Sequence, residues 1–204
     1  MKKYFVYKEP FAWFFFLNAW EQCKLSNLGT IQTGNTPSTA IAEYYSESGL
    51  LWVTPTDITE GILIDTARKL SDKGEKVGRV IPKNSILCTC IASIGKNAFL
   101  PEKCAFNQQI NALTPNEEKH YPYFLYTDSY HWSQTMKKSA GGLTFQIVNK
   151  TEFSNIYTYV PVQLGEEKKI GDLFLNIDSL ITLHQRKHEK LQNIKKALLS
   201  KMFA

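Results

Sequence analysis

The C-terminal stretch of this chain constrains its fold more than any other part of the sequence. Residues 166–203 contain no proline, and their only glycine is Gly171, near the start. Apolar residues recur there with a heptad period, the pattern of a helix that packs along a seam against other helices. At 1.5 Å per residue the helix would be roughly 55 Å long, longer than a domain of the preceding residues is wide. The seam therefore predicts a partner helix, in a second copy or in another protein.

The seam consists of two heptad positions, each of which recurs every seven residues and places its side chains in a column along the helix. His184 and Lys187 interrupt these apolar columns midway. Polar seam residues usually set the register of a coiled coil at a cost in stability. The alternative is a lone amphipathic helix folded across its own domain. The residues predicted to pair with a partner helix, in a homodimer, are Ile170, Leu173, Ile177, Leu180, His184, Leu191, Ile194 and Leu198.

The middle of the chain has a different pattern. From residue 20 to about residue 120, short apolar runs such as Ile86–Ile94 and Ile110–Leu113 are separated by glycines and prolines, which predicts short strands. Residues 121–139 carry a proline in the first turn and two lysines in the last, which predicts a helix. Two more strands are predicted over Thr144–Val148 and Ile156–Val162.

These patterns predict an α+β fold in three parts. Residues 1–19 form an aromatic leader of unusual composition, and residues 20–163 form a β-rich domain with a packed helix. Residues 164–204 form a long coiled-coil helix for spacing or dimerisation. No internal repeat or low-complexity segment divides the domain further.

Composition restricts the classes of protein to consider. The 24 Lys and Arg against 19 Asp and Glu give a formal charge of +5, which leans towards anionic partners. Four cysteines do not make a disulfide framework and no secretory leader is recognisable, so we expect a cytoplasmic protein. The apolar run Phe11–Leu17 is far shorter than the ~20 residues that cross a bilayer, so no membrane is expected as a partner.

Catalytic motifs are not recognisable in the sequence. Gly95-Lys96-Asn97 resembles the end of a phosphate-binding loop but lacks the first glycine and the Mg²⁺-binding hydroxyl. Cys88 and Cys90 lack a second cysteine pair, so we interpret them as core residues rather than zinc ligands. No nucleophile with a nearby base and no methyl-donor motif can be placed. We therefore predict a protein that is not an enzyme, with no metal and no cofactor.

Four landmarks occur together in one order. They are Gly34–Ser38; Ser93–Gly95 followed by Phe106–Pro115; Gly141–Ile147; and Ile177–Ile181 through Leu191–Leu199. This arrangement resembles the specificity subunit of type I restriction-modification enzymes, over about residues 20–204. Trp20–Leu25 is similar to the usual opening of a domain in that family, whereas residues 1–19 are not similar to its usual leader.

The resemblance implies a function. In that family a target recognition domain reads one half of a split double-stranded DNA sequence, and helices set the distance to the other half. The chain is therefore expected to direct the methyltransferase subunit, and through it the restriction subunit, to DNA. The methyl donor and ATP are expected on those partner subunits. The chain resembles a half-subunit, with one recognition domain and one helical spacer. The alternative is a coiled-coil interaction or regulatory protein, such as a silent specificity copy, that reads no DNA.

The expected DNA contacts lie in loops rather than strands. Polar or small residues in the glycine-rich turns are suited to phosphates and base edges, with Gln146 and Asp57 as base-reading candidates. Asn107-Gln108-Gln109 is instead predicted to tie neighbouring backbone edges together. The loop candidates are Thr36, Ser38, Thr54, Thr56, Asp57, Ser93, Lys96, Gly141, Gly142, Thr144 and Gln146, each of which has an ordinary turn residue as its alternative. A basic cluster expected to contact phosphates comprises Arg68, Lys69, Lys73, Lys76 and Arg79, with solvated charge as its alternative.

Overall fold

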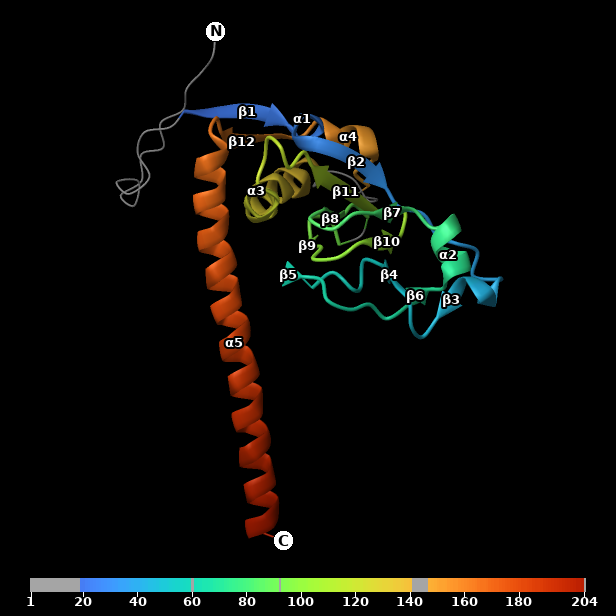
Figure 1. The fold of residues 1–204 in the computed structure, drawn as a ribbon, viewed down its shortest axis with the longest axis vertical. Helices are drawn as coiled ribbons and strands as arrows, with labels where there is room; N and C mark the ends of the chain where they lie inside the picture. The colour runs from blue at the N-terminus through green and yellow to red at the C-terminus, as the bar shows by residue number, and fades with distance from the viewer. Residues whose placement is uncertain (1–18, 60, 92, 141–146, 204) are drawn as a thin grey trace.

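The computed structural model describes residues 19–59, 61–91, 93–140 and 147–203 (Figure 1). Within these residues, the strands form two five-stranded sheets and one two-stranded sheet. The first sheet has the order β2-β11-β8-β9-β5, with bounds β2 (Gly29–Thr33), β11 (Ile110–Pro115), β8 (Ile86–Thr89), β9 (Asn97–Phe99) and β5 (Gly61–Ile62). The second sheet has the order β3-β6-β4-β10-β7, with bounds β3 (Tyr45–Ser46), β6 (Lys69–Leu70), β4 (Leu50–Val53), β10 (Cys104–Phe106) and β7 (Val80–Ile81).

The third sheet pairs the two ends of the domain. Strand β1 (Trp20–Lys24) runs antiparallel to β12 (Tyr157–Pro161). The helices are α1 (Leu25–Leu28), the short 3₁₀ helix η2 (Ala42–Tyr44), α2 (Asp72–Val77), α3 (Pro122–Ala140), α4 (Lys150–Ser154) and α5 (Leu164–Met202). Because β12 ends just before α5 begins, the two-stranded sheet lies beside the origin of the long helix, as Figure 1 shows.

Strand β8 is buried on both of its faces. Ile86 and Cys88 belong to the apolar core that includes residues of α3, whereas Leu87 belongs to the core that includes residues of β4 and β10. A strand covered on both sides is apolar along its length instead of alternating. This explains the continuous apolar run of the sequence in this region.

Several sequence predictions are confirmed by the structure. The α+β class holds, and α3 matches the helix predicted over residues 121–139. Strand β12 lies within the strand predicted over Ile156–Val162, and α5 covers nearly all of the predicted long helix. Cys88 and Cys90 are buried core residues, as interpreted. Of the strand predicted over Thr144–Val148, residues 144–146 lie outside the described residues, and Ile147 forms an isolated bridge with Ile91.

Other elements differ from the sequence prediction. Lys73 and Lys76 were expected between strands, but they lie on α2, where the Ser71 side chain accepts a hydrogen bond from the Gly74 N–H at 3.2 Å. Helix α4 was not predicted, although Asn149 and Glu152 form a capping box at its start. Both helices are shorter than two turns, so neither shows a helical period; only their caps mark them.

Helix α5 extends well beyond the domain. Its first turns lie against α3 and β12, and the rest runs past the sheets to an isolated C-terminal end (Figure 1). Along this length the seam residues Leu180, Leu191, Ile194 and Leu198 are exposed. The helix therefore does not fold across its own domain. Within the described ranges, no helix combines the length and apolarity needed to span a membrane.

Candidate functional site

One end of the first sheet gathers several of the predicted loops. The antiparallel register pairs Asn111 with Thr33 and Ile110 with Thr89. The C-terminal ends of β2 and β8 therefore lie beside the N-terminal end of β11. The chain segments that leave these strand ends include residues 34–38, 93–96 and 107–109.

The second sheet adds a fourth loop at the same place. Strand β4 runs parallel to β10, with Val53 beside Phe106, so both strands end together. The Asn107 N–H donates to the Val53 carbonyl at 2.8 Å. Residues 54–57 thus emerge next to residues 107–109. We call the set of residues 34–38, 54–57, 93–96 and 107–109 the loop surface.

Side-chain amides of Asn107 and Gln108 fasten this surface, but mainly through the Thr36 hydroxyl rather than through the neighbouring backbone edges that the sequence predicted. The Asn107 Oδ1 accepts from the Gln109 N–H at 2.8 Å, and its Nδ2 donates to the Thr36 Oγ1 at 3.0 Å. The Thr36 hydroxyl in turn donates to the Gln108 Oε1. Thr36, a predicted DNA contact, is exposed. The hydrogen bonds to Asn107 and Gln108 hold its hydroxyl in place.

Gly34 allows the closest approach within the loop surface. A Cβ at this position would lie 2.2 Å from the carbonyl oxygen of Phe106, so any side chain would displace the backbone. The neighbouring Asn35 N–H donates to that same carbonyl at 2.9 Å. The glycine therefore sets the path of the segment that carries Thr36 and Ser38, and both of these are exposed.

Asp57 is already engaged by donors of its own chain. Its Oδ2 accepts from the Thr54 N–H at 2.8 Å and from the Thr54 hydroxyl at 2.6 Å, and its Oδ1 accepts from the Ala67 N–H at 2.9 Å. The carboxylate therefore joins the turn after β4 to the segment that leads into β6. Of this loop's candidates, the exposed Thr56 is the more accessible to a ligand.

These contacts predict that Asp57→Asn destabilises the fold. Asparagine replaces one carboxylate oxygen by an NH₂ group, which would face an N–H or O–H donor and leave that donor without an acceptor. We expect this to cost about 1–3 kcal/mol of unfolding free energy. Urea titration measures the loss. Asp72→Asn is the control, because Asp72 is exposed in the first turn of α2, and a change of only a few tenths of a kcal/mol is expected there. Equal stability of the two variants would leave Asp57 without a structural role.

The predicted basic cluster is divided by the structure. Arg79 lies at the loop surface, where its Nη1 donates to the Thr33 carbonyl and its N–H donates to the Asn35 Oδ1 at 2.6 Å. Arg68 lies 6.0 Å from the centre of the Tyr45 ring, at a shallow groove that Lys69 also lines.

The lysines of this cluster are mostly paired. Lys69 pairs with Asp65 at 3.0 Å, and Lys73 pairs with Glu43. Lys76 is exposed on α2. The cluster is therefore divided among three places rather than forming a single patch: Arg79 at the loop surface, Arg68 and Lys69 at the shallow groove, and Lys73 and Lys76 on α2.

Ser93 and Lys96 lie in the turn between β8 and β9. The Thr89 hydroxyl accepts from the Lys96 N–H at 3.0 Å and donates to the Ser93 carbonyl. The Lys96 side chain is exposed. The candidates Gly141, Gly142, Thr144 and Gln146 lie outside the described residues. The chain is next described at Ile147, and the Val148 N–H donates to the Cys90 carbonyl at 2.9 Å, beside this turn.

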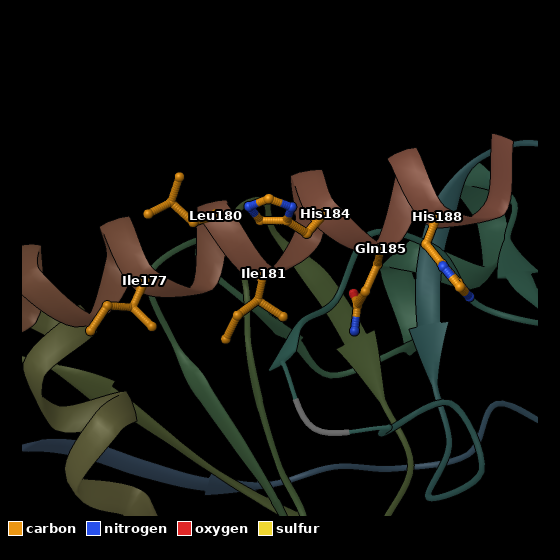
Figure 2. Close-up of a pocket in the computed structure, with 6 residues that line it drawn as sticks. All are labelled: Ile177, Leu180, Ile181, His184, Gln185 and His188. Carbon is orange, nitrogen blue, oxygen red and sulfur yellow. The ribbon is translucent and has the colours of Figure 1, made fainter. Parts of the chain in front are cut away.

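A shallow hollow lies on the seam of α5, and all the residues that line it come from this one helix. Figure 2 shows its six residues projecting from α5: Ile177, Leu180, Ile181, His184, Gln185 and His188. The hollow is an exposed helix face, not an enclosed cavity. Among the described residues, no group of three or more His, Cys, Asp or Glu side chains could hold a metal ion.

Sequence reasoning missed one group of residues near the start of α5. Glu167 is buried and lies 2.9 Å from the Nδ1 of His120. Nothing in the local sequence marks this pair, because the two residues are 47 positions apart and each lies in a polar stretch. A glutamate on a long helix is expected to be solvated, so only the packing of α5 against α3 identifies it.

The chain is similar to known proteins in both sequence and fold. Residues 18–193 match the family model described as type I restriction modification DNA specificity domain. The chain is 29% identical over 191 residues to the type I restriction enzyme MjaIX specificity subunit of Methanocaldococcus jannaschii, covering 90% of this chain and 44% of that protein. It is 32% identical over 147 residues to the HindI specificity subunit of Haemophilus influenzae, covering 70% of this chain and 32% of that protein.

A solved structure has a similar fold. The S subunit of a type I restriction-modification system from M. genitalium superposes with a TM-score of 0.65 at 15% sequence identity, covering 88% of this chain and 44% of that chain. This chain therefore spans less than half the length of the relatives that it matches.

Proposed function

The chain belongs to the type I restriction modification DNA specificity family, and on that premise we propose that it reads a DNA sequence through its loop surface. It would direct methyltransferase and restriction subunits to that sequence. Family members are generally non-catalytic, and we propose the same for this chain, with the methyl donor and ATP bound by its partner subunits. The rival hypothesis of an interaction protein that reads no DNA is not favoured by this membership.

The convergence of four loops from two sheets is the observation that carries the proposal. Exposed hydroxyls of Thr36, Ser38 and Thr56 lie on segments whose backbones are fixed by hydrogen bonds. Hydroxyls, amides and backbone N–H groups are the donors that commonly contact phosphates and base edges. The exposed Lys96 and Arg79 supply positive charge at the same end. A rigid, polar and cationic surface is what DNA reading requires.

The number of loop surfaces leads to the second part of the proposal. Because the described residues form a single loop surface, we propose that this domain reads one half of a split site. A second recognition domain, paired through the seam of α5, would read the other half. If that domain belongs to a second copy of this chain, the two-fold symmetry requires a palindromic split site.

The test is co-expression with a methyltransferase subunit encoded beside this chain, followed by mapping of methylated adenines on genomic DNA. Methylation at a split palindromic motif supports the proposal with a homodimer. Methylation at an asymmetric or uninterrupted motif contradicts the homodimer. A stable complex that methylates no motif contradicts sequence reading by this chain.

Lys96→Gln is expected to weaken DNA binding without changing the sequence preferred. The lysine is exposed, and loss of one phosphate contact should reduce the slope of log affinity against log salt by about one. Fluorescence anisotropy with duplex DNA at several salt concentrations gives this slope. Lys190→Gln, on the exposed part of α5, is the matched control and should leave the slope unchanged. Equal slopes in the two variants would remove residues 93–96 from the DNA-binding surface.

A further inference from the structure

Polar contacts join the start of α5 to the start of α3 and the residues just before it. These contacts lie outside the loop surface. Glu167 on α5 is 1% exposed. Its Oε1 lies 2.9 Å from the Nδ1 of His120, and its Oε2 accepts from the Tyr121 N–H at 2.6 Å. A buried carboxylate is rare unless it is fully engaged, and here both oxygens have partners at the beginning of α3.

Two tyrosines extend these contacts along α5. The Tyr121 hydroxyl donates to the Asp172 Oδ1 at 2.7 Å, and the Tyr123 hydroxyl donates to the Asp178 Oδ2 at 2.7 Å. The hydrogen bond to Asp172 raises the pKa of Tyr121 to about 12, and burial, followed by the hydrogen bond to Asp178, raises the pKa of Tyr123. A tyrosine hydroxyl is protonated at neutral pH in any case, and the raised pKa values show that both hydroxyls are held as donors to carboxylates. We call Glu167, Asp172 and Asp178 with their three partners the helix clamp.

Apolar packing alone does not fix the direction of α5 at this interface. Ile170 and Leu175 are partly buried against the core that contains α3, whereas Leu173 and Ile177 are exposed. Gly171 brings the two elements close, because a Cβ there would lie 2.6 Å from the Tyr121 ring. This glycine sets how closely α5 approaches Tyr121, but one point of close approach does not define the angle between the two elements. The acceptors of the helix clamp, spread over about three turns of helix, are what define an axis.

We infer that the helix clamp sets the angle at which α5 leaves the recognition domain, and thereby the spacing between the two DNA half-sites that a paired assembly reads. This inference rests on the proposed function. The part of α5 beyond Asp178 is roughly 36 Å long, so a tilt of about 10° moves its end by about 6 Å. That displacement is close to two base-pair steps of about 3.4 Å each. Tyr121, Tyr123 and Glu167 are therefore positioning residues for spacing, not for the bases read.

The test combines a distance measurement with a spacer measurement on a Tyr121→Phe, Tyr123→Phe double variant. The variant keeps both rings and removes only the hydroxyls. Nitroxide labels at Glu102→Cys in the domain and Ser200→Cys near the end of α5 report the angle, because both positions are exposed. The background carries Cys23→Ser, since Cys23 is the cysteine that is not fully buried. Labelled chains are diluted with unlabelled chains so that only distances within one chain are measured.

We expect the double variant to broaden the distance distribution by several ångströms. The methyltransferase assembled with this variant should also accept sites whose spacers differ by one or two base pairs from the preferred length. Methylation of such sites should be at least tenfold higher than with the parent chain. The half-site sequences should stay the same. Tyr130→Phe is the matched control, because Tyr130 lies on α3, as Tyr123 does, but is exposed and outside the helix clamp. The control should behave as the parent.

The outcomes separate this inference from the proposed function. An unchanged distance distribution in the double variant overturns the inference, whether or not the parent methylates DNA. A broadened distribution with an unchanged spacer preference also overturns it, because the angle would then not determine spacing. A parent that binds and methylates no DNA sequence overturns the proposed function, while the distance measurement still tests the angle.

Discussion

Replacement of Leu191 and Leu198 by aspartate is expected to weaken association through α5 at least about 100-fold. The two side chains are 56% and 55% exposed, so an aspartate at either position can stay hydrated in the unpaired chain. Burial of a leucine contributes about 1.5–3 kcal/mol, and each 1.4 kcal/mol is a tenfold change in affinity. Sedimentation equilibrium over a range of concentrations measures the loss.

The control for this experiment places the same charges on the other side of the helix. Asn193→Asp with Ser200→Asp moves each substitution two residues along, which is about 200° around the helix axis. Both positions are exposed. We expect this control to associate as the parent does and both variants to keep the parent's melting temperature. If the leucine variant still sediments like the parent, the seam is not the interface.

Trp132→Ala is expected to have the largest effect on folding, a loss of about 3–5 kcal/mol of unfolding free energy. Trp132 lies on α3, is 1% exposed, and belongs to the core that joins α3 to the first sheet. Truncation would leave a cavity that neither α3 nor β8 can fill without moving. A urea titration followed by circular dichroism measures the loss, and a small domain with this deficit would be close to unfolded.

Trp132→Phe separates packing from hydrogen bonding at the same site. Within the described residues, the indole Nε1 of Trp132 is buried and has no hydrogen-bond acceptor. Phenylalanine removes this unpaired donor and keeps most of the ring, so we expect a loss below about 2 kcal/mol. Trp20→Ala, at a partly exposed position, should also cost less than Trp132→Ala. A Trp132→Phe loss as large as that of Trp132→Ala would contradict the packing argument.

Long elements with a clear period could be predicted from the sequence. Helices α3 and α5 each repeat an apolar pattern over several turns, and both were placed to within two residues. Short elements could not be predicted in this way. Helix α2 has six residues and β10 has three, so each offers less than two periods of any pattern. Their conformations depend on contacts that span tens of residues in the chain.

In the candidate site, too, some features could be predicted from the sequence and others depend on contacts between distant segments. Loop positions such as Thr36 and Lys96 are recognisable because glycine and proline interrupt apolar runs around them. The engagement of Asp57 by Ala67, however, is a contact between two separate segments. The sequence placed Asp57 correctly in a turn but could not show that both of its carboxylate oxygens have donors. The division of the basic cluster among the loop surface, the shallow groove and α2 is likewise a result of packing.

The sequence by itself determined the periodic elements and the apolar seam, because each pattern repeats between residues close together in the chain, and it indicated the family through short strings that occur in one order. Only the tertiary structure decided the convergence of four loops at one end of the sheets, since strand register pairs residues as far apart in the chain as Thr33 and Asn111, 78 positions. It also decided the helix clamp, because burial gives Glu167 a role that its solvated sequence neighbours do not have. Local patterns fix local conformation, whereas burial and register arise when distant segments exclude water together.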